Sequence, residues 1–237
     1  EGLLVIDTSL YHGTNKFSEG LVHLSRASDY RHIYLNKNGE VVIVLNEGSH
    51  GGDFTEGLAY FADNGKYGFI DRDGQIVIKP RFDAAFSFSE GLAAIYDNDK
   101  WGFIDKTGDF VIEPKFQMCW PFSYGFARVK MGDKQGFIDK SGNFLLEPQF
   151  YFAEDFSEGL APVYIGGNKV PFQPTITPAL LQHPYFKDLY QINGGQWGYI
   201  DEYGKLIFIF DHKYVVSKFY NERAKIKAED RSGYIDK

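Results

Sequence analysis

The stretch from Lys100 to Phe116 reads K-W-G-F-I-D-K-T-G-D-F-V-I-E-P-K-F. It holds two alternating apolar runs, Trp101 to Ile104 and Phe110 to Ile112, which the turn D-K-T-G joins. Aromatic and β-branched residues suit a pleated, half-buried surface, and a loop that ends in Gly suits a residue at positive φ. The stretch therefore predicts a β-hairpin.

A second element, F-S-E-G-L-A, recurs along the chain at a fixed interval. Its copies begin at Phe54, Phe88, Phe122 and Phe156, and they carry the evenly spaced glycines Gly57, Gly91, Gly125 and Gly159. In the regular units this glycine is followed first by the W-G glycine (Gly68, Gly102, Gly136) and then by the turn glycine (Gly74, Gly108, Gly142). A constant period of roughly 34 residues is typical of repeat proteins, and degenerate copies extend the pattern to both ends. We expect six units of about 34 residues in an all-β fold.

These motifs resemble those of the WG-repeat (KWG-repeat) proteins, a mostly bacterial family of β-repeat modules. The resemblance rests on K-W-G-F-I-D-K at Lys100, Q-W-G-Y-I-D-E at Gln196, K-Y-G-F-I-D-R at Lys66, the V-I-x-P-x-F endings at Val77 and Val111, and the F-S-E-G-L-A elements. It spans nearly the whole chain. It implies a set of repeat modules with no shared activity, and no family catalytic residues that could be assigned here.

Each unit is predicted to form three strands, as at Leu92 to Tyr96, Trp101 to Ile104 and Phe110 to Ile112, with a short fourth strand in the stretch Phe116 to Trp120. The N-terminal stretch from Glu1 to Ile6 fits the second half of a hairpin, and Gly233 to Lys237 fits the first half. Pairing between strands near Val5 and Tyr234 would close the array and remove both exposed edges. We therefore favour a closed, propeller-like array, with an open β-superhelix as the alternative.

The fifth unit carries an insertion, at about 165–195, within an otherwise single domain over residues 1–237. It contains four prolines: Pro171, Pro174, Pro178 and Pro184. Because proline cannot donate to a strand ladder, we expect no regular strand there. Pro178 to Gln182 could form one helical turn. Loops on a repeat scaffold carry recognition, so the insertion is the predicted contact element.

Composition narrows the function classes. The 237 residues are 43% hydrophobic, with a net charge of −7 that argues against nucleic-acid binding. No apolar run is as long as a membrane span, which needs roughly 18 residues. Because the chain begins with Glu1 rather than Met, we expect that a signal peptide or another upstream region has been removed. Export from a bacterial cell and a cytoplasmic location both stay open, as does the oligomeric state.

Two sets of carboxyl residues recur once per unit. The turn-entry positions hold Asn36, Asp71, Asp105, Asp139, Asp201 and Asp236, and we expect these side chains to accept local backbone hydrogen bonds rather than bind calcium. The F-S-E-G glutamates are Glu19, Glu56, Glu90 and Glu158. We expect each to cap a turn or pair with a lysine of a neighbouring unit, although two converging in a cleft could act as acid and base.

The six histidines have no metal-binding spacing, and Cys119 is expected to be a small buried residue. No catalytic, phosphate-binding or dinucleotide motif is present. The sequence therefore predicts no cofactor, no metal site and no enzymatic activity.

The W-G position varies as His32, Tyr67, Trp101, Gln135, Trp197 and Ser232. This variation suggests partial exposure, so the rings there could grip a ligand or pack between repeats. We predict a non-catalytic scaffold for a protein or peptide partner, with carbohydrate or cell-wall binding as the alternative. The predicted binding residues are Phe172, Tyr185, Phe186, Tyr190, Trp197, Trp101 and Tyr67.

Overall fold

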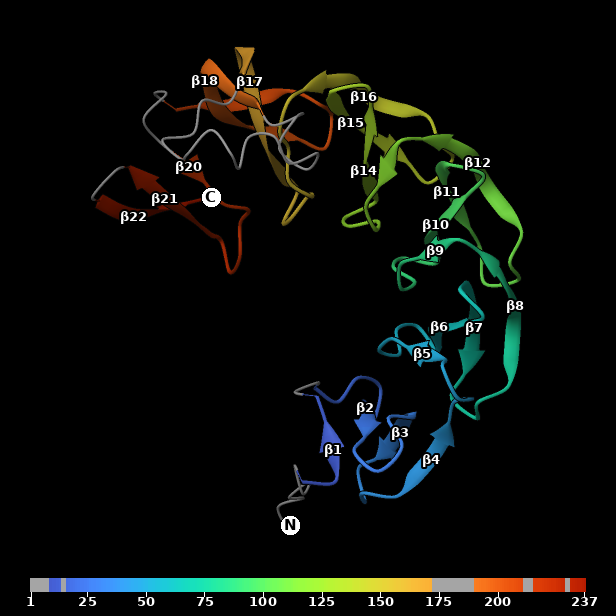
Figure 1. The fold of residues 1–237 in the computed structure, drawn as a ribbon. Coiled ribbons are helices and arrows are strands. Elements are labelled where there is room, and N and C mark those ends of the chain that lie inside the picture. Colours follow the sequence, from blue (N-terminus) through green and yellow to red (C-terminus); the bar gives the residue numbers. More distant parts are fainter. Residues whose placement is uncertain (1–8, 14–15, 172–189, 211–214, 229–230) are drawn as a thin grey trace. The chain divides into compact units, whose positions relative to one another are not determined.

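The computed structural model describes residues 9–13, 16–171, 190–210, 215–228 and 231–237. Within these residues all the regular secondary-structure elements are β-strands. The strands form six antiparallel sheets, numbered 1 to 6 in chain order (Figure 1). The predicted all-β class and the six units are confirmed.

The sheets repeat one up-and-down order. Sheet 1 holds β1 (Tyr11–His12), β2 (Leu21–Arg26), β3 (His32–Asn36) and β4 (Val41–Val44). Sheet 2 holds β5 (His50–Gly51), β6 (Leu58–Asp63), β7 (Lys66–Asp71) and β8 (Ile76–Phe82). Sheet 3 holds β9 (Ala84–Ala85), β10 (Ala93–Asp97), β11 (Lys100–Ile104) and β12 (Phe110–Phe116).

The later sheets follow the same plan. Sheet 4 holds β13 (Met118–Cys119), β14 (Phe126–Met131), β15 (Lys134–Asp139) and β16 (Phe144–Phe150). Sheet 5 holds β17 (Leu160–Pro171), β18 (Tyr190–Asp201) and β19 (Leu206–Ile209), and sheet 6 holds β20 (Val215–Val216), β21 (Arg223–Ala228) and β22 (Arg231–Asp236). The predicted short fourth strand is β13, and β12 is longer than predicted because it continues through Pro114 to Phe116.

The glycine of the W-G motif lets the second hairpin strand approach closely. In sheet 3, Trp101 is opposite Phe116 but Phe103 is opposite Ile112, so β12 bulges where it passes Gly102. A Cβ atom on Gly102 would lie 2.5 Å from the backbone oxygen of Ile112 and 2.7 Å from the nitrogen of Pro114. Proline fits this bulge because its missing N–H would otherwise need a partner. The motif V-I-x-P thus needs a glycine across from it.

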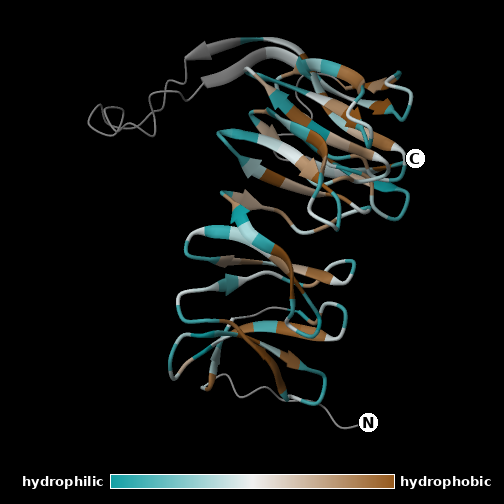
Figure 2. Ribbon diagram, turned by 90° about the vertical axis from the view of Figure 1, so that its right-hand side faces the viewer, coloured by the Kyte–Doolittle hydropathy of each residue, from teal (hydrophilic) through white to brown (hydrophobic). Residues whose placement is uncertain are grey.

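The core lies between adjacent sheets. The aromatic residue that follows the W-G glycine packs its ring against the F-S-E-G phenylalanine of the next sheet, with ring centroids 4.8–5.1 Å apart. These pairs are Tyr34–Phe54, Phe69–Phe88, Phe103–Phe122, Phe137–Phe156 and Tyr199–Phe219. Figure 2 shows the hydrophobic residues along the strands and many of the hydrophilic ones in the turns. Each sheet therefore buries its apolar face against its neighbour, as repeat modules do.

Two compact units can be distinguished, residues 1–129 with 139–143 and residues 130–138 with 144–237. Sheets 1 to 3 lie in the first unit and sheets 5 and 6 in the second. The predicted closure involves residues 1–8, which lie outside the described residues, so closure stays a prediction, as does the single-domain organisation. Of the residues described, none forms a helix that could span a membrane.

The prediction that prolines exclude a strand from the insertion is wrong for its two ends. β17 runs to Pro171, and its Cα partners in β18 continue from Ile165 opposite Gln196 to Pro171 opposite Tyr190. The ladder tolerates Pro171 because this residue is the last of its strand, where the missing N–H costs no interior bond. The predicted helical turn at Pro178 to Gln182 lies outside the described residues.

Candidate functional site

The predicted binding residues at the W-G position lie in three different sheets: Tyr67 in β7, Trp101 in β11 and Trp197 in β18. All three side chains are half-buried. The Trp101 ring stacks on Phe86 at 5.1 Å and contacts Tyr96 at 5.4 Å. The predicted partial exposure is therefore confirmed, but one face of the Trp101 ring is already in contact within its own sheet.

The other two rings are also engaged. Tyr67 contacts Tyr60 at 6.0 Å, and Trp197 contacts Tyr164 at 5.5 Å between centroids. Both also pack against core clusters that adjacent sheets share. These contacts support the packing interpretation of this position.

The two ends of the insertion are not loops. They extend the β17–β18 hairpin. β17 and β18 pair through 11 residue pairs, compared with 5 for β10 and β11. Tyr164 opposite Trp197 corresponds to Tyr96 opposite Trp101, and Ile165 opposite Gln196 corresponds to Asp97 opposite Lys100, so the extra ladder begins at Gly166 opposite Gly195. Tyr190 is the first residue of β18, whereas Phe172, Tyr185 and Phe186 lie outside the described residues.

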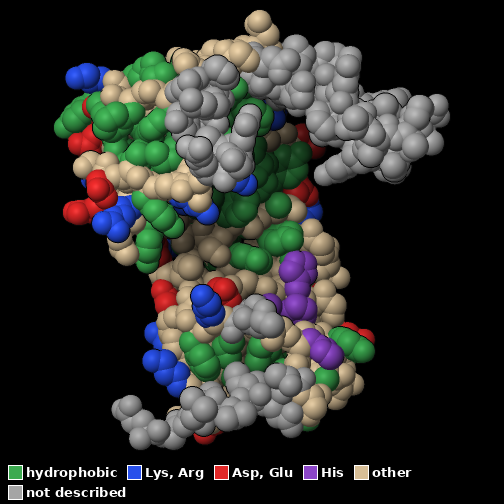
Figure 3. All heavy atoms as spheres, turned by 90° about the vertical axis from the view of Figure 1, so that its left-hand side faces the viewer, with side chains coloured by type: hydrophobic (Ala, Val, Ile, Leu, Met, Phe, Trp, Pro, Cys, Tyr) green, Lys and Arg blue, Asp and Glu red, His purple; other side chains and the backbone are tan. Residues whose placement is uncertain are grey.

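Three histidines come together on sheets 1 and 2, although their spacing in the sequence does not predict a cluster. His23 Nε2 lies 2.8 Å from His32 Nδ1, and the His32 and His50 ring centroids are 6.2 Å apart. His50 Nε2 lies 3.2 Å from the hydroxyl of Tyr67. Figure 3 shows histidine side chains gathered on one face of the molecule.

Hairpin register could have revealed this cluster. Ser25 pairs with His32, so His23 lies two residues along the same face of the neighbouring strand. Diagonal same-face neighbours in antiparallel strands are within reach of one another. His32 also replaces the W-G tryptophan, so a histidine there marks a unit whose surface differs from the consensus.

The buried position of His23 disfavours its charged form. Burial, followed by the positive charges that His32 and His50 can carry, lowers the pKa of His23 to about 4. Burial and His50 also lower the pKa of His32. At neutral pH one ring therefore donates to the other, since a neutral imidazole has one donor and one acceptor nitrogen.

The F-S-E-G glutamates of sheets 1, 2, 3 and 5 each clamp their sheet to the next one by capping its F-S-E-G turn, and two of them also pair with a lysine of the neighbouring unit, as predicted. Glu19, Glu56, Glu90 and Glu158 accept hydrogen bonds of 2.9 Å from the backbone N–H of Gly57, Gly91, Gly125 and Glu222. Lys106 and Lys140 add ion pairs of 3.2 Å to Glu56 and Glu90. These carboxylates have structural partners and do not converge in one cleft as an acid–base pair.

Five of the six turn-entry residues behave as predicted, whereas the sixth, Asp236, accepts a hydrogen bond at Oδ1 from Arg223 Nε at 3.0 Å. Asp105 Oδ1 accepts hydrogen bonds from the N–H groups of Thr107 and Asp109 at 2.9 and 3.1 Å. The same pattern occurs at Asn36, Asp71, Asp139 and Asp201. Within the described residues, no group of three or more His, Cys, Asp or Glu side chains is placed to hold a metal ion.

Cys119 is fully buried, as predicted for a small hydrophobic residue. Burial raises the pKa of its thiol, so the reactive thiolate is disfavoured.

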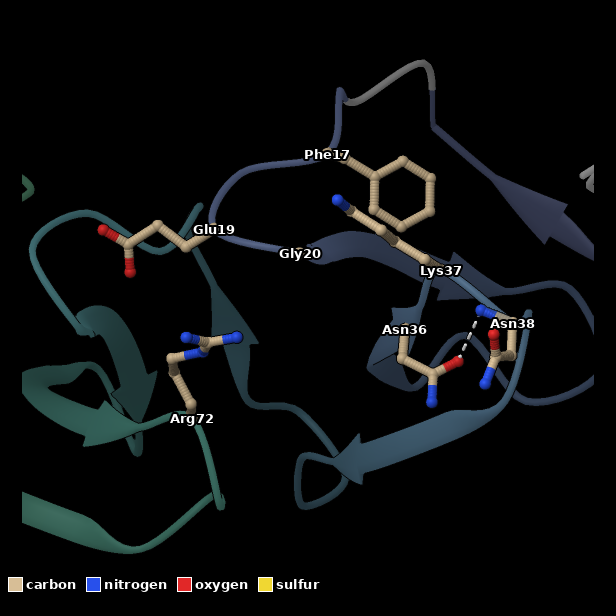
Figure 4. A pocket seen from close by; sticks show the side chains of 7 residues that line it. All are labelled: Phe17, Glu19, Gly20, Asn36, Lys37, Asn38 and Arg72. Atoms are coloured by element: carbon tan, nitrogen blue, oxygen red, sulfur yellow. Dashed lines mark hydrogen bonds between the residues drawn. The ribbon is translucent and has the colours of Figure 1, made fainter. Parts of the chain in front are cut away.

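An open pocket of about 810 Å³ lies at the turns of sheets 1 and 2. Its lining residues are Phe17, Glu19, Gly20, Asn36, Lys37, Asn38 and Arg72 (Figure 4). Figure 4 shows the Phe17 ring and the Lys37 side chain close together on one side and Arg72 with Glu19 on the other. Among the described residues neither Lys37 nor Arg72 forms an ion pair within 4.0 Å, so two cationic groups border this pocket.

The fold and these contacts define a repeat protein whose modules are four-stranded or three-stranded β-sheets. Comparison with protein families then names the module: the WG containing repeat matches residues 67–101, 101–134 and 136–168. The predicted resemblance is thus confirmed, and the chain contains WG repeats over residues 67–168.

A search of the curated proteins found no significant match. Among solved structures, the chain is similar to dihydro-heme d1 dehydrogenase NirN, with 14% identity, a TM-score of 0.49, and coverage of 96% of this chain and 54% of NirN. It is also similar to BamB from Moraxella catarrhalis, with 9% identity, a TM-score of 0.46, and coverage of 94% and 82%. The chain thus spans about half the length of NirN, and these weak similarities do not bear on activity or ligands.

Proposed function

We propose that this chain is a non-catalytic repeat scaffold that binds a protein or peptide through the extended β17–β18 hairpin. The observation that carries the proposal is the pairing of Ile165–Pro171 with Tyr190–Gln196. This part of the β17–β18 ladder extends beyond the residues that have another segment of sheet 5 beside them. β19 pairs only with Gly198 to Ile200, and the Phe210 N–H bonds to the Trp197 oxygen.

The far side of β17 is covered over a similar length. Ala153 bridges to Val163, and Tyr164 N–H donates to the oxygen of Phe152 at 2.8 Å. Beyond Tyr164 and Trp197, the two strands have no third strand beside them among the described residues. Their outer backbone groups are thus suited to an added strand, a common mode of peptide recognition.

Trp197 lies at the base of this extension, half-buried against Tyr164. The contact surface is then the hairpin extension with Tyr190, the first residue of β18, together with Phe172, Tyr185 and Phe186, which lie between the two strands in the sequence. Trp101 and Tyr67, in other sheets, then have packing roles. Since one face of the Trp101 ring is taken by Phe86, the described residues offer no observation in favour of carbohydrate binding there.

Selection from a displayed random-peptide library tests the proposal. One target is the full chain, and the other is a variant in which Asn-Gly joins Ile165 to Gln196. Asn64-Gly65 already makes this turn between β6 and β7, with φ of 49° and 75°, so the variant should fold. We expect peptides that bind the full chain and not the variant.

A matched control replaces Trp101 with Phe, which leaves the hairpin unchanged. Selected peptides should bind this variant like the unmodified chain. Peptides that bind the shortened variant equally well would overturn the proposal, as would the loss of binding in the Trp101→Phe variant alone.

A further inference from the structure

The contact between sheets 1 and 2 differs from the next two contacts along the chain at three positions. One lies in the first long strand of a sheet, one is the W-G position, and one lies in the short edge strand of the following sheet. Between sheets 1 and 2 these positions hold His23, His32 and His50. The equivalent residues are Tyr60, Tyr67 and Ala84 between sheets 2 and 3, and Ala94, Trp101 and Met118 between sheets 3 and 4. Of these three contacts, only the first has groups there that change charge near neutral pH.

The two histidines of sheet 1 form a hydrogen bond that depends on their protonation. His23 Nε2 lies 2.8 Å from His32 Nδ1, and the ring centroids are 4.9 Å apart. The bond needs an N–H on one nitrogen and a bare lone pair on the other. A proton on the accepting nitrogen leaves two N–H groups facing each other, and the bond is lost.

His50 extends this pair across the boundary between the sheets. Its ring centroid lies 6.2 Å from that of His32, and its Nε2 lies 3.2 Å from the hydroxyl of Tyr67. Neither His32 nor His50 forms an ion pair with a carboxylate among the described residues. Positive charges on both rings would therefore repel each other across the contact.

The other titratable groups around the cluster do not change charge in the same range of pH. The tyrosines that face it are Tyr34 in β3, Tyr60 in β6 and Tyr67 in β7, and they stay neutral well above pH 7. Two carboxylates lie nearby: the charge of Asp53 acts on Tyr34 and Tyr60, and Asp63 accepts a hydrogen bond from Ser49. His12, in β1, is exposed and stacks on Tyr30.

The opposite end of the same contact is held by a different bond. Leu21 pairs with Asn36 at one end of the β2–β3 hairpin, and Ser25 pairs with His32 at the other. Glu19, just before Leu21, accepts a hydrogen bond of 2.9 Å from the N–H of Gly57. Loss of the histidine contacts thus leaves this clamp in place.

We propose that the three histidines make the contact between sheets 1 and 2 an acid-sensitive joint, which opens at its histidine end while the Glu19 clamp holds the other end. Burial, together with the charges of His32 and His50, lowers the pKa of His23 to about 4, and burial and His50 also lower the pKa of His32. Histidines with lowered pKa values bind protons better once the joint is open. The joint is therefore closed above pH 6.5 and opens as the pH falls toward 4.

Distances between nitroxide spin labels, measured by pulsed electron paramagnetic resonance, test the proposal. Arg31, Lys66 and Lys100 each come directly before the W-G residue of sheets 1, 2 and 3. Labels on Arg31→Cys with Lys66→Cys span the joint, and labels on Lys66→Cys with Lys100→Cys span the next contact as a control. Both pairs are made with Cys119→Ala, since Ala85 and Ala153 already fill that position in other sheets.

Acidification should separate the labels only across the joint. From about pH 7.5 to about pH 4.5, the first pair should gain a second, longer distance that disappears when the pH is raised again. The control pair should keep its distance. A single distance across the joint down to about pH 4.5, or equal separation of the control pair, overturns the proposal.

Variants of the histidines assign the response. His23→Tyr with His32→Tyr and His50→Ala gives the joint the residues of the contact between sheets 2 and 3, and the longer distance should be absent. His50→Ala alone, at an exposed side chain, should move the opening to lower pH because one positive charge is removed. His12→Gln should open like the parent. An unchanged opening in the triple variant and in His50→Ala overturns the proposal.

Discussion

The carboxylate of Glu56 accepts a hydrogen bond of 2.9 Å from the backbone N–H of Gly91, which lies in the next sheet. Glu56 sits in a left-handed conformation, with φ of 54°, that residues other than Gly, Asn and Asp rarely adopt. The residue thus has a conformational cost within its own turn, which the bond to the next sheet offsets. The clamp explains why the motif has Glu-Gly where Asn-Gly would be the easier turn.

Removing this clamp should weaken the contact between sheets 2 and 3. We expect Glu56→Ala to lower the free energy of unfolding by about 1–2 kcal/mol, because a charged acceptor is lost at a partly exposed site. Glu56→Gln keeps an acceptor oxygen and loses only the attraction to Lys106, so its cost should be below about 1 kcal/mol. Urea denaturation checks both values. Equal effects from the two substitutions would show that the hydrogen bond is not the stabilising part.

The glycine of the W-G motif should be irreplaceable only where a bulged strand faces it. Gly102→Ala places a Cβ 2.5 Å from a backbone oxygen, and we expect a loss of about 3 kcal/mol. Gly233 occupies the same motif position in sheet 6, and nothing lies within 4 Å of a Cβ built there. Gly233→Ala should change stability by less than about 0.5 kcal/mol. Thermal and urea unfolding of the pair measure the difference, and similar losses would contradict the bulge explanation.

Sheet 6 contains a strained position that can be relieved. Glu222 stands where the other units have glycine, with φ of 60°. Glu222→Gly should stabilise the chain by about 1 kcal/mol, because glycine adopts this conformation without the Cβ cost. The N–H that donates to Glu158 is retained. In the reciprocal variant Gly125→Ala, at φ of 83°, stability should fall by a similar amount. A Glu222→Gly protein that is less stable than the parent would show that the Glu222 side chain contributes a contact.

Stability should depend on pH through His23. Its folded-state pKa is lowered to about 4 from an ordinary 6.5, so the unfolded chain binds more protons between these values. The stabilisation is complete above pH 6.5 and is lost as the pH falls toward 4, by up to about 3 kcal/mol. Urea unfolding across pH 4–7 measures this slope.

His23→Tyr is the matched variant, because Tyr60 fills the same position in sheet 2. It should flatten the slope, while His12→Gln, at an exposed histidine, should leave it unchanged. An identical slope in the His23→Tyr variant would assign the pH dependence to other groups.

Much of this fold could be predicted because the motifs are local. The turn D-K-T-G, the alternating runs around Trp101 and the even spacing of the F-S-E-G glycines indicate strands and units directly. The bulge at Gly102 could not be predicted, since it depends on how Pro114 passes the neighbouring strand. The hairpin to Pro171 was missed because proline rules describe strand interiors, whereas Pro171 ends its strand.

The histidine cluster was missed for a different reason. Searches for metal or catalytic spacing consider one segment at a time, whereas His23, His32 and His50 come from three strands. Register pairs Ser25 with His32 and so places His23 beside it. Candidate sites in repeat proteins are therefore better sought among residues that strand register places side by side, within one unit and in the next.

The central claim is that the scaffold and the contact element are separable. The measurement that tests it most directly is the dissociation constant of a peptide selected on the full chain, titrated against the variant in which Asn-Gly joins Ile165 to Gln196. We predict at least a hundredfold weaker binding with an unfolding free energy unchanged to within about 1 kcal/mol. An unchanged dissociation constant in the folded variant would contradict the account.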